Sequence, residues 1–355
     1  MSSRPPMAGG RRSRPTMRDV AALAGVATKT VSRVMNGDPT VAPELAERVR
    51  DATDKLGYRP NLTASSLRRG AGRTATIGLL LEDVSNPFSA ALLRAVEDQA
   101  RGRGVQVLIG SLDEDTVRER ELARTLIDRQ VDGLIIVPAG PDQGYLLAES
   151  RLGVCTVFLD REPRLFDADA VVSDNRGGAA AAIEHLLAFG HERIGYLGDS
   201  LAIATAAQRF HGYERALERA GCATDPRIIT HGVRTLDVAT RATTEMMRQP
   251  DPPTAIFCSQ NLITIGAVKA LHQLGLENAV ALVGFDDFLL ADVLTPGITV
   301  ITQDASGLGR LAAQLLFARM DGDDSPARTH VAPTGLIPRG SGEIKPAGAM
   351  SGVAL

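Results

Sequence analysis

The sequence predicts an N-terminal all-α helix-turn-helix unit followed by a larger α/β domain. Residues 16–36 contain two short amphipathic segments with helical periodicity, joined by a turn at Gly25. From Thr76 onward, apolar runs typical of buried strands alternate with amphipathic helices, and this alternation predicts parallel sheets with right-handed crossovers. Gly70-Ala71-Gly72 lies between the two regions and is predicted to be a linker.

The first helix is predicted to begin after Thr16, because Thr16 and Asp19 have the spacing of a capping box. Gly25 ends it, since glycine adopts a left-handed conformation at little cost. A second helix is predicted over 28–35 and a third over 43–56. The apolar positions expected to pack these helices together are Val20, Leu23, Ala24, Val31, Val34, Met35, Leu45, Val49, Ala52 and Leu56.

The α/β region is predicted as a series of strands that alternate with helices. The predicted strands cover 77–82, 105–110, 133–137, 154–160, 170–174, 193–198, 227–231, 254–258 and 280–285. The predicted helices cover 88–101, 116–129, 179–189, 208–220, 238–249 and 263–274. Ligands bind at the carboxyl ends of the strands in such sheets, so polar residues that follow the strands are candidates for a binding site.

The charge of the chain is unevenly distributed. The whole chain carries a net charge of −3. Residues 1–73 hold 14 Lys and Arg residues against 6 Asp and Glu residues, a net charge of +8, whereas the remaining residues carry a net charge of −11. A basic head on an acidic body suits a polyanionic partner for the head and repels it from the body.

The composition is ordinary for a soluble globular protein, with 44% hydrophobic and 23% charged residues. Cys155, Cys222 and Cys258 form no CxxC pair, and Cys155 and Cys258 lie in apolar runs, which indicates buried free thiols and a reducing compartment. No apolar run approaches the roughly 18 residues that a membrane span needs. The N-terminus lacks the apolar region of a secretion signal. We therefore expect a cytoplasmic protein without a membrane partner.

The segment AxxAGVxxxTVSRVMNG, at residues 21–37, resembles the DNA-binding headpiece of the LacI/GalR (lactose-repressor/galactose-repressor) family of bacterial transcription regulators. Ala27 departs from the pattern, because the family usually has Ser or Thr at this position, where it caps the second helix. The resemblance covers about residues 16–342. Beyond the segment it continues through Val41, Leu56-Gly57-Tyr58, Pro60-Asn61 and Ala64 to Leu67.

The resemblance implies that the α/β region is similar to periplasmic sugar-binding proteins of type I. Such a domain has two α/β lobes, a hinge of crossing strands and a cleft for a small effector. The resulting parts of the chain are a disordered basic tail (1–15), a helix-turn-helix DNA-binding headpiece (16–60), a hinge segment and linker (61–73), a two-lobed effector-binding and dimerisation domain (74–344) and a disordered tail (345–355).

The second helix is expected to read DNA in the major groove. Lys29 and Arg33 are expected to donate to guanine O6 and N7, and Thr28 to contact a base edge or a thymine methyl group. The simpler interpretation of Lys29 is a solvated surface charge. The residues that suit phosphate contacts are Thr16, Thr30, Ser32 and Asn36.

In the hinge segment, the resemblance implies that Leu67 inserts into the minor groove at the dimer axis. Asn61, Ala64 and Leu67 occupy the matching positions of the family. Inserting an apolar side chain between base steps kinks the duplex. A purely structural role for Leu67 is less favoured, because the sequence near it offers no core for it to join.

The candidate effector site combines residues that follow strands with residues at the family's effector positions. Arg209 and Asp286 match positions that bind effector hydroxyls or charges, and Phe88 can stack on a sugar ring. The full set is Asn86, Phe88, Asp160, Arg161, Asp174, Arg209, Asn261 and Asp286. Asn175 is either part of this site or the cap of the helix that follows it. Gln260-Asn261 stands where the family commonly has Asn-Asp, which favours a less hydroxyl-rich or differently charged ligand.

These observations predict a sequence-specific transcriptional repressor that binds a palindromic operator in double-stranded DNA as a homodimer and responds to a small-molecule effector, a sugar or sugar derivative. No leucine-heptad tail follows residue 340, which favours a dimer over a tetramer. An enzyme is not predicted, because GxSxG, GxxxxGKS/T and HExxH motifs are missing, and Asp286 and Asp287 alternate in direction along a strand. No metal ion or cofactor is expected. The alternative is a solute-binding or sugar-processing protein with a fused DNA-binding headpiece.

Overall fold

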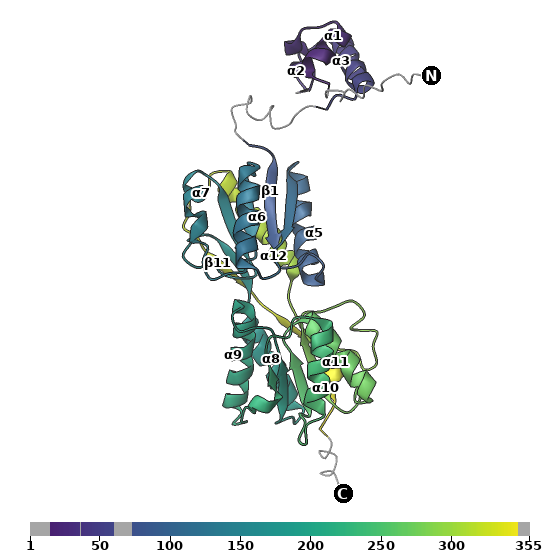
Figure 1. Ribbon diagram of the computed structural model, residues 1–355, viewed down its shortest axis with the longest axis vertical. Helices are drawn as coiled ribbons and strands as arrows, with labels where there is room; N and C mark the ends of the chain where they lie inside the picture. Colours follow the sequence, from purple (N-terminus) through teal and green to yellow (C-terminus); the bar gives the residue numbers. More distant parts are fainter. Residues whose placement is uncertain (1–14, 36, 60–72, 347–355) are drawn as a thin grey trace, which may run out of the picture. The chain divides into compact units, whose positions relative to one another are not determined.

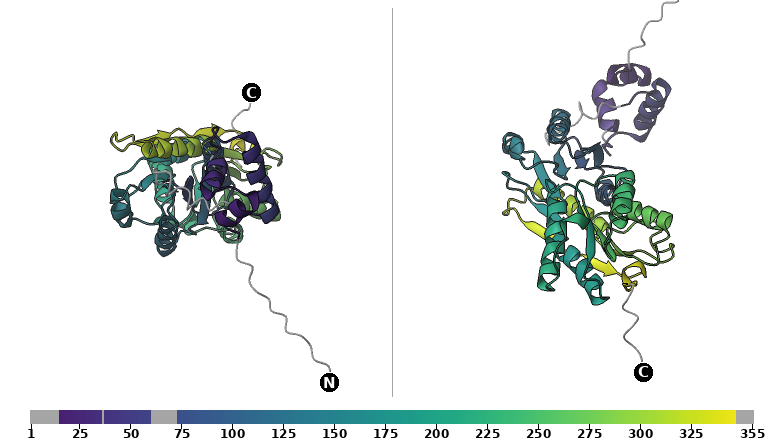
Figure 2. Two further views of the ribbon diagram at one scale, coloured as in Figure 1. Left: turned by 90° about the horizontal axis from the view of Figure 1, so that it is seen from above. Right: turned by 60° about the horizontal axis from the view of Figure 1, so that its bottom comes forward.

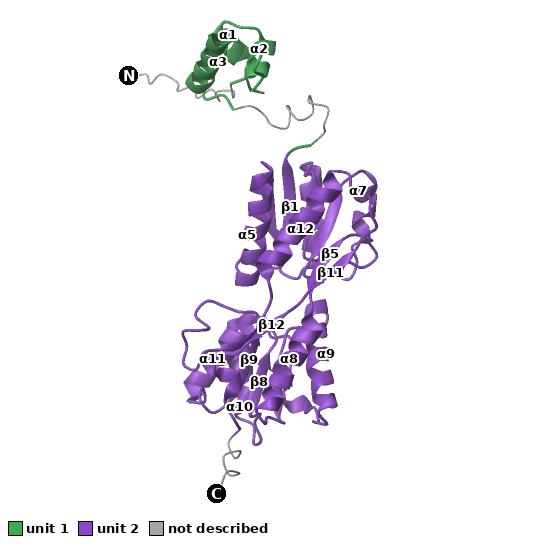
Figure 3. Ribbon diagram, turned by 180° about the vertical axis from the view of Figure 1, so that it is seen from behind, with its two compact units in different colours: residues 1–74 green, residues 75–355 purple. Residues whose placement is uncertain are grey.

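The structure is a computed structural model, and it describes residues 15–35, 37–59 and 73–346. The chain divides into two compact units, residues 1–74 and 75–355 (Figure 3). The predictions that lie outside the described residues are those for the tails before residue 15 and after residue 346, for the hinge segment up to residue 72, and for Asn36, Asn61, Ala64 and Leu67.

The first unit consists of short helices that begin and end where the sequence predicts. They are α1 (Met17–Ala24), α2 (Thr28–Met35) and α3 (Pro43–Leu56). The capping box is confirmed, because the Asp19 carboxylate accepts from the Thr16 N–H at 2.7 Å and the Thr16 hydroxyl accepts from the Asp19 N–H at 3.4 Å. Gly25 ends α1 in the left-handed conformation, with φ 64°.

The core of the first unit lies where the three helices meet. Leu23 was predicted to join this core, but it is 53% exposed, so that prediction is wrong. The physical reason is that α2 and α3 pack against a narrower face of α1 than the apolar pattern indicates. The buried core residues are Val20, Ala21, Ala24, Val31, Val49 and Ala52.

The first lobe of the second unit is a six-stranded parallel sheet with helices on its faces (Figure 1). Its strand order is β11-β5-β4-β3-β1-β2. The strands are β1 (Thr76–Leu81), β2 (Gln106–Ser111), β3 (Gly133–Ile136), β4 (Cys155–Leu159), β5 (Ala170–Ser173) and β11 (Thr329–Ala332). The helices are α5 (Pro87–Gly102), α6 (Thr116–Asp128), α7 (Leu147–Arg151) and α12 (Ala305–Met320), with a 3₁₀ turn over Gly144–Leu146.

The second lobe repeats this architecture with the strand order β12-β10-β9-β8-β6-β7, in which only β12 runs antiparallel. The strands are β6 (Ile194–Leu197), β7 (Ile229–Thr230), β8 (Ala255–Cys258), β9 (Ala281–Phe285), β10 (Thr299–Thr302) and β12 (Gly335–Ile337). The helices are α8 (Asn175–Ala188), α9 (Ala204–Arg219), α10 (Leu236–Met247) and α11 (Asn261–Leu274), with 3₁₀ turns over Pro226–Ile228 and Ser341–Glu343.

Within its described residues, the chain passes between the lobes after β5, after β10 and after β11 (Figures 1 and 2). The second passage brings α12 back to the first lobe, where it packs against α5 and contributes Leu308, Leu316 and Phe317 to the core. The third takes the chain from β11 to β12 in the second lobe. These short connections confirm the expected two lobes joined by crossing segments.

The predicted alternation of strands and helices is confirmed, with differences at some ends. Helices α8 and α9 begin at Asn175 and Ala204, earlier than the predicted starts at 179 and 208. Strand β7 is shorter than predicted, because residues 226–228 form a 3₁₀ turn. Helices α7 and α12 and strands β10, β11 and β12 lie outside the helix and strand ranges predicted above. Within the described ranges, none of the helices combines the length and apolar composition that a bilayer crossing requires.

Candidate functional site

Helix α2 of the first unit presents polar side chains to solvent. Thr28 and Lys29 are exposed in its first turn, and Arg33 is exposed one turn later. Thr30 and Ser32 are half-buried. The residues predicted to contact bases therefore lie on the accessible part of α2. Thr30 and Ser32, which are predicted to contact phosphate, are less accessible to DNA.

Arg33 is held by acceptors in the loop that follows α2. Its Nε donates to Asp38 Oδ2 at 2.8 Å, and its guanidinium also donates to Thr40 Oγ1. The N–H of Thr40 in turn donates to Asp38 Oδ1 at 2.9 Å. Hydrogen bonds from Thr40 and Arg33 hold the pKa of the Asp38 carboxyl well below its usual range. The loop thus restricts the orientation of Arg33, although this side chain remains 44% exposed.

Thr16 is exposed, but its hydroxyl takes part in the cap of α1. The hydroxyl donates to Asp19 Oδ2 at 2.7 Å. A contact between this hydroxyl and a phosphate therefore has to replace its hydrogen bond to Asp19.

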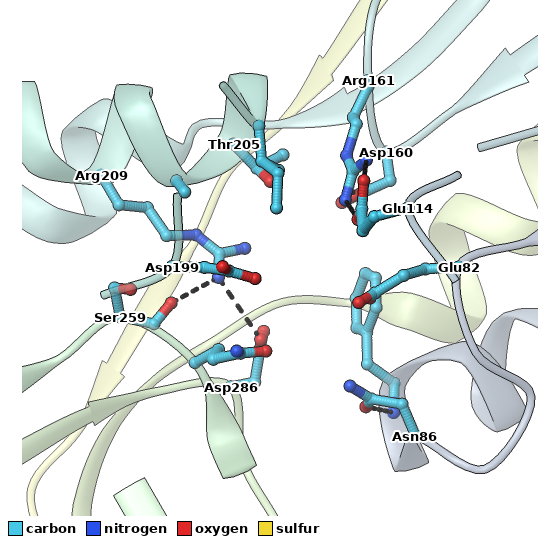
Figure 4. Close-up of a pocket in the computed structure, with 14 residues that line it drawn as sticks. Glu82, Asn86, Glu114, Asp160, Arg161, Asp199, Thr205, Arg209, Ser259 and Asp286 are labelled. Carbon is cyan, nitrogen blue, oxygen red and sulfur yellow. Dashed lines mark hydrogen bonds and ion pairs between the residues drawn. The ribbon is translucent and has the colours of Figure 1, made fainter. Parts of the chain in front are cut away.

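The second unit has a polar cleft between its two lobes (Figure 4). Most of its lining residues lie in loops at the carboxyl ends of the strands or in the first turns of α5 and α9. The first lobe contributes Glu82, Asn86, Phe88, Glu114, Asp160 and Arg161. The second lobe contributes Asp199, Thr205, Arg209, Ser259, Gln260 and Asp286, together with two apolar residues. Both sheets thus direct their carboxyl ends to one cavity, where ligands of such sheets bind.

Arg161 is buried and bound by acceptors of its own lobe. Its Nη1 and Nη2 donate to the two Glu114 oxygens at 2.7 and 2.5 Å, and Nη1 also donates to the carbonyl of Pro138 at 3.0 Å. Its Nε lies 3.6 Å from Asp160 Oδ2. The Arg161 and Glu114 side chains are only 7% and 5% exposed, so this forked ion pair is a fixed part of the cleft wall.

Arg209, on α9, is held in an equally defined position in the second lobe. Its Nε donates to Asn175 Oδ1 at 2.7 Å, and its Nη1 donates to the carbonyl of Ser259 at 2.6 Å. Its guanidinium lies over the ring of Phe285, 3.8 Å from the ring centroid. Nη1 also lies 3.6 Å from Asp286 Oδ2. These partners fix the guanidinium plane at the cleft.

Asp174 is not brought into the cleft, in contrast to the prediction. It is exposed at the N-cap of α8, where its carboxylate accepts from the Gly177 N–H at 2.8 Å. Asn175 is therefore not the cap of α8, and it is instead the buried partner that orients Arg209. The cap that the sequence offered to Asn175 thus belongs to Asp174, and neither residue lines the cleft.

Asn261 also lies outside the cleft lining, although it contacts a residue of the lining. Its Nδ2 donates to Asn86 Oδ1 at 3.0 Å, a hydrogen bond that joins the two lobes. Its own Oδ1 accepts from the Leu262 N–H at 2.7 Å. The predicted effector contact of Asn261 is thus replaced in this structure by a contact between the lobes.

Asp160 and Asp286 occupy corresponding places in the two lobes. Asp160 follows β4 with φ 65°, and Asp286 follows β9 with φ 69°. Non-glycine residues rarely adopt this left-handed conformation, although aspartate does so more readily than most. Asp286 Oδ1 accepts from Gln303 Nε2 at 2.5 Å, whereas the buried Asp160 Oδ1 has no partner among the described residues.

The cleft carboxylates have altered proton affinities. Burial, followed by the charge of Glu114, raises the pKa of Glu82 to about 7. Burial likewise raises the pKa of Asp199 and of Asp286, although Arg234 and Arg209 act against the shift. Glu82 therefore changes its charge near neutral pH.

Sequence reasoning missed three acidic residues of the lining: Glu82, Glu114 and Asp199. Each follows a strand, namely β1, β2 or β6, within a few residues. The position after a strand is thus the pattern that could have identified them, as it did for Asp160 and Asp286. Glu82 was assigned to the strand itself, and the other two were assigned no role.

Among the described residues, no group of His, Cys, Asp and Glu has the arrangement of a metal site. The three cysteines are free. Cys258 is buried as predicted, whereas Cys155 is only half-buried because it lies at the first position of β4.

Comparison with known protein families gives two matches in this chain. Residues 16–61 match the family described as bacterial regulatory proteins, lacI family. Residues 183–342 match the periplasmic binding protein-like domain. One match lies in each unit, over the helices of the first unit and over the second half of the two-lobed domain.

Individual proteins are similar over nearly the whole chain. The ribose operon repressor of Haemophilus influenzae is 32% identical over 318 residues, which are 89% of this chain and 95% of that protein. The Lac repressor dimer bound to operator and the anti-inducer ONPF has a similar structure, with a TM-score of 0.80, 25% identity and coverage of 93% of this chain and 99% of that chain. The regulator CelR in complex with cellobiose has a TM-score of 0.68, 30% identity and coverage of 92% and 100%.

Proposed function

This chain belongs to the lacI family of bacterial regulatory proteins, and on that basis we propose that it is a transcriptional repressor that binds a palindromic operator as a homodimer under the control of a small effector. The main support for the proposal is that a DNA-binding type of unit and a ligand-binding type of domain occur in one chain. A helix-turn-helix unit with an exposed polar second helix precedes a two-lobed domain with a polar cleft at its strand ends.

The DNA-reading role rests on the exposed part of α2. We propose that Lys29 and Arg33 donate to guanine and that Thr28 contacts a neighbouring base edge. We further propose that Leu67, with Asn61 and Ala64, acts in the minor groove. The net charge of +8 on residues 1–73 supports the attraction to DNA. The residues proposed to contact phosphates are Thr16, Thr30, Ser32 and Asn36.

The effector role rests on the cleft between the lobes. We propose a sugar or sugar derivative as ligand, because Phe88 offers a ring face and Asp160, Arg209 and Asp286 offer fixed polar groups. The CelR–cellobiose complex and the name of the ribose operon repressor support this ligand class. A ligand that contacts both lobes binds the closed arrangement more tightly than the open one, and it thereby shifts the population that binds DNA.

The homodimer follows from the way a single helix-turn-helix unit reads DNA. One unit reads one half-site, so a specific operator of ordinary length requires two copies related by a two-fold axis. The Lac repressor with a similar fold is a dimer on its operator. We therefore propose a palindromic operator whose half-sites each face one α2.

A regulator of this kind acts where the chromosome lies, so we propose a cytoplasmic location and no enzymatic activity. The alternative is a solute-binding or sugar-processing protein with a fused headpiece. It predicts that the second unit binds or converts a sugar while DNA binding has no sequence preference. The two hypotheses therefore differ in the specificity of DNA binding.

Selection of bound sequences from random duplex DNA with the full-length chain tests the proposal. We expect a palindromic motif with two half-sites at a fixed spacing. Arg33→Ala should lose this motif, whereas Lys55→Ala, which removes an exposed charge from the end of α3, should retain it. If the wild-type chain enriches no motif, either alone or with a panel of sugars, the alternative is favoured.

A further inference from the structure

The cleft contains more negative than positive side chains. Its lining includes five carboxylates and two guanidinium groups. The carboxylates are Glu82, Glu114, Asp160, Asp199 and Asp286, and the guanidinium groups belong to Arg161 and Arg209. A neutral sugar needs hydrogen-bond donors and acceptors but no such excess of one charge.

Both arginines are already occupied by the protein. Arg161 forms its forked ion pair with Glu114 and also donates to a backbone carbonyl. Arg209 donates to Asn175 and to the carbonyl of Ser259, and lies near Asp286. A phosphate or carboxylate on a ligand would therefore compete with existing partners in a cleft of net negative charge, which disfavours an anionic effector.

Three carboxylates remain without full compensation. The buried Asp160 is only 7% exposed, and its Oδ1 has no partner among the described residues. Asp199 accepts from the Ser200 N–H at 2.6 Å, and its cationic partner Arg234, at 3.1 Å, has a side chain that is 44% exposed. Glu82 forms no ion pair that the structure shows, and the charges of Glu114, Asp160 and Asp199 disfavour its ionised form, against the opposing charge of Arg161. Arg161 lies 3.6 Å from Asp160, so Glu82 and Asp199 are the carboxylates with the most to gain from a positive charge on a ligand.

The uncompensated groups come from opposite lobes and face the same space. Figure 4 shows Glu82 of the first lobe pointing toward Asp199 of the second lobe across the open centre of the cleft, whereas the carboxylate of Glu114 lies against Arg161. Phe88 also lines this cleft. The described carboxylates do not have the arrangement of a metal site. A cation in this position is therefore an organic one with a face that can lie on an aromatic ring.

We propose that the effector of this cleft is an amino sugar whose ammonium group lies between Glu82 and Asp199, a proposal that rests on the effector role proposed above. The ammonium group donates to these carboxylates, and the sugar ring lies against Phe88. The hydroxyl groups of the sugar contact Asp160 and Asp286.

The same arrangement explains how such an effector would act on the lobes. In the empty cleft, the charges of Glu82 and Asp199 repel each other across the gap, so these like charges oppose closure. An ammonium group between them turns this repulsion into attraction from both sides. The ligand therefore favours the closed arrangement specifically, which is the condition for a change in DNA binding.

The binding test uses matched sets of sugars with the purified full-length chain. Each set contains an amino sugar, its parent sugar and its N-acetyl derivative: glucosamine with glucose and N-acetylglucosamine, and the corresponding galactose and mannose sets. Titration calorimetry at pH 7 should show that at least one amino sugar binds about tenfold or more tightly than both neutral members of its set. Added salt should reduce this preference, because it screens the charge interaction.

Two variants separate the charge from the shape of the cleft. Glu82→Gln should remove most of the preference for the amino sugar, and Glu121→Gln, which neutralises an exposed residue of α6, should retain it. Without ligand at pH 8, Glu82→Gln should raise the melting temperature by a few degrees, because it relieves repulsion, whereas Glu121→Gln should leave it unchanged.

The outcomes also distinguish this inference from the proposed function. If a neutral sugar binds as tightly as its amino partner, or if none of the three amino sugars binds, the inference fails while a palindromic operator still supports the repressor. A lower melting temperature for Glu82→Gln also overturns the inference, because it shows that the charge of Glu82 is compensated. If the repressor assignment is wrong, the result is different, because the chain then enriches no DNA motif in the selection.

Discussion

Asn86 and Asn261 belong to different lobes and share a hydrogen bond in which Asn261 Nδ2 donates to Asn86 Oδ1 at 3.0 Å. The same oxygen caps α5, because it accepts from the Phe88 N–H at 3.0 Å. Both asparagines are buried. Separation of the lobes at this point has to break the bond, so the pair is a direct link between the two halves of the cleft.

Asn261→Ala should therefore favour the open arrangement. The change removes the contact between the lobes but leaves the cap of α5 in place, and a hydrogen bond of this kind contributes about 1 kcal/mol. We expect faster amide hydrogen exchange in the first turns of α5 and α11, by about fivefold. Asn278→Ala, at an exposed position, serves as the control. Equal exchange in the two variants would mean that the bond does not hold the lobes together.

Asp38→Ala tests whether the loop after α2 prepares Arg33 for DNA. Without Asp38, the guanidinium loses the acceptor of its Nε and gains rotational freedom. We expect the ratio of specific to non-specific DNA affinity to fall about fivefold or more, as measured by competition with random duplex DNA. Asp54→Ala changes the net charge of the same unit equally, so it controls for general attraction to DNA. A fall of equal size in both variants would assign the effect to charge alone.

Ala27→Ser should stabilise α2, because Ala27 precedes the helix and has no side-chain acceptor for its first N–H groups. A serine at an N-cap contributes about 1 kcal/mol relative to alanine. Amide exchange within α2 should slow about fivefold in the full-length chain. The control is Ala22→Ser, at an exposed position within α1. It should not slow amide exchange, since serine is a weaker helix former than alanine. Unchanged exchange in Ala27→Ser would show that this N-terminus is already satisfied.

The rule that ligands bind at the carboxyl ends of parallel strands was enough to locate the cleft from the sequence. The side-chain contacts that depend on tertiary structure were not predicted. Asp160 and Asp286 were identifiable because each ends a strand of a parallel sheet. The bond between Asn86 and Asn261 was not, because the two residues are 175 positions apart and meet only through the hinge. Asn175 likewise acquires its role from Arg209, which lies on another helix.

Two glycines lie in helices that differ from the prediction, Gly178 in α8, which starts earlier than predicted, and Gly309 in α12, which was not predicted. Glycine lowers helix propensity, so neither residue favours a helix locally. In the structure a Cβ on Gly178 would lie 2.6 Å from Thr334 Oγ1, and one on Gly309 would lie 2.6 Å from the Leu92 carbonyl. These glycines allow α8 and α12 to approach their neighbours closely. Packing therefore decided these elements against their local propensity.

The pH dependence of the free energy of unfolding should include a contribution from the titration of Glu82. Its pKa is raised from 4.5 to about 7 in the folded chain, first by burial and then by the charge of Glu114. An acid with a raised pKa contributes stability that is fully present below its unfolded value and is lost as the pH rises through the folded value. We expect the wild type to lose stability relative to Glu82→Gln between about pH 4.5 and about pH 7, by about 3 kcal/mol at most.

Melting curves of both proteins across this range measure the effect. The difference between them should be small near pH 4.5 and should level off above about pH 8.5, where Glu82 is almost fully charged in both the folded and the unfolded chain. Asp199 and Asp286 titrate in the same direction, but they are present in both proteins and cancel in the comparison. A difference that does not change with pH would assign the effect of the substitution to packing.

Arg209→Ala should abolish the response to effector while operator binding is retained. The guanidinium is fixed by Asn175, by the Ser259 carbonyl and by the ring of Phe285, so its direction at the cleft is set before a ligand binds. Asn175→Ala removes one of these supports without touching the cleft, and we expect about a tenfold weaker effector affinity from it. Arg215→Ala, on the exposed face of α9, should behave as the wild type.

Loss of Arg209 also leaves Asp286 buried without its nearest cation. An unpaired buried carboxylate destabilises the fold, so Arg209→Ala alone should lower the melting temperature as well. Adding Asp286→Asn to Arg209→Ala should restore part of this stability but not the effector response, because the guanidinium is still missing. A double variant that regains the response would instead show that Arg209 serves only to neutralise Asp286 and does not contact the ligand.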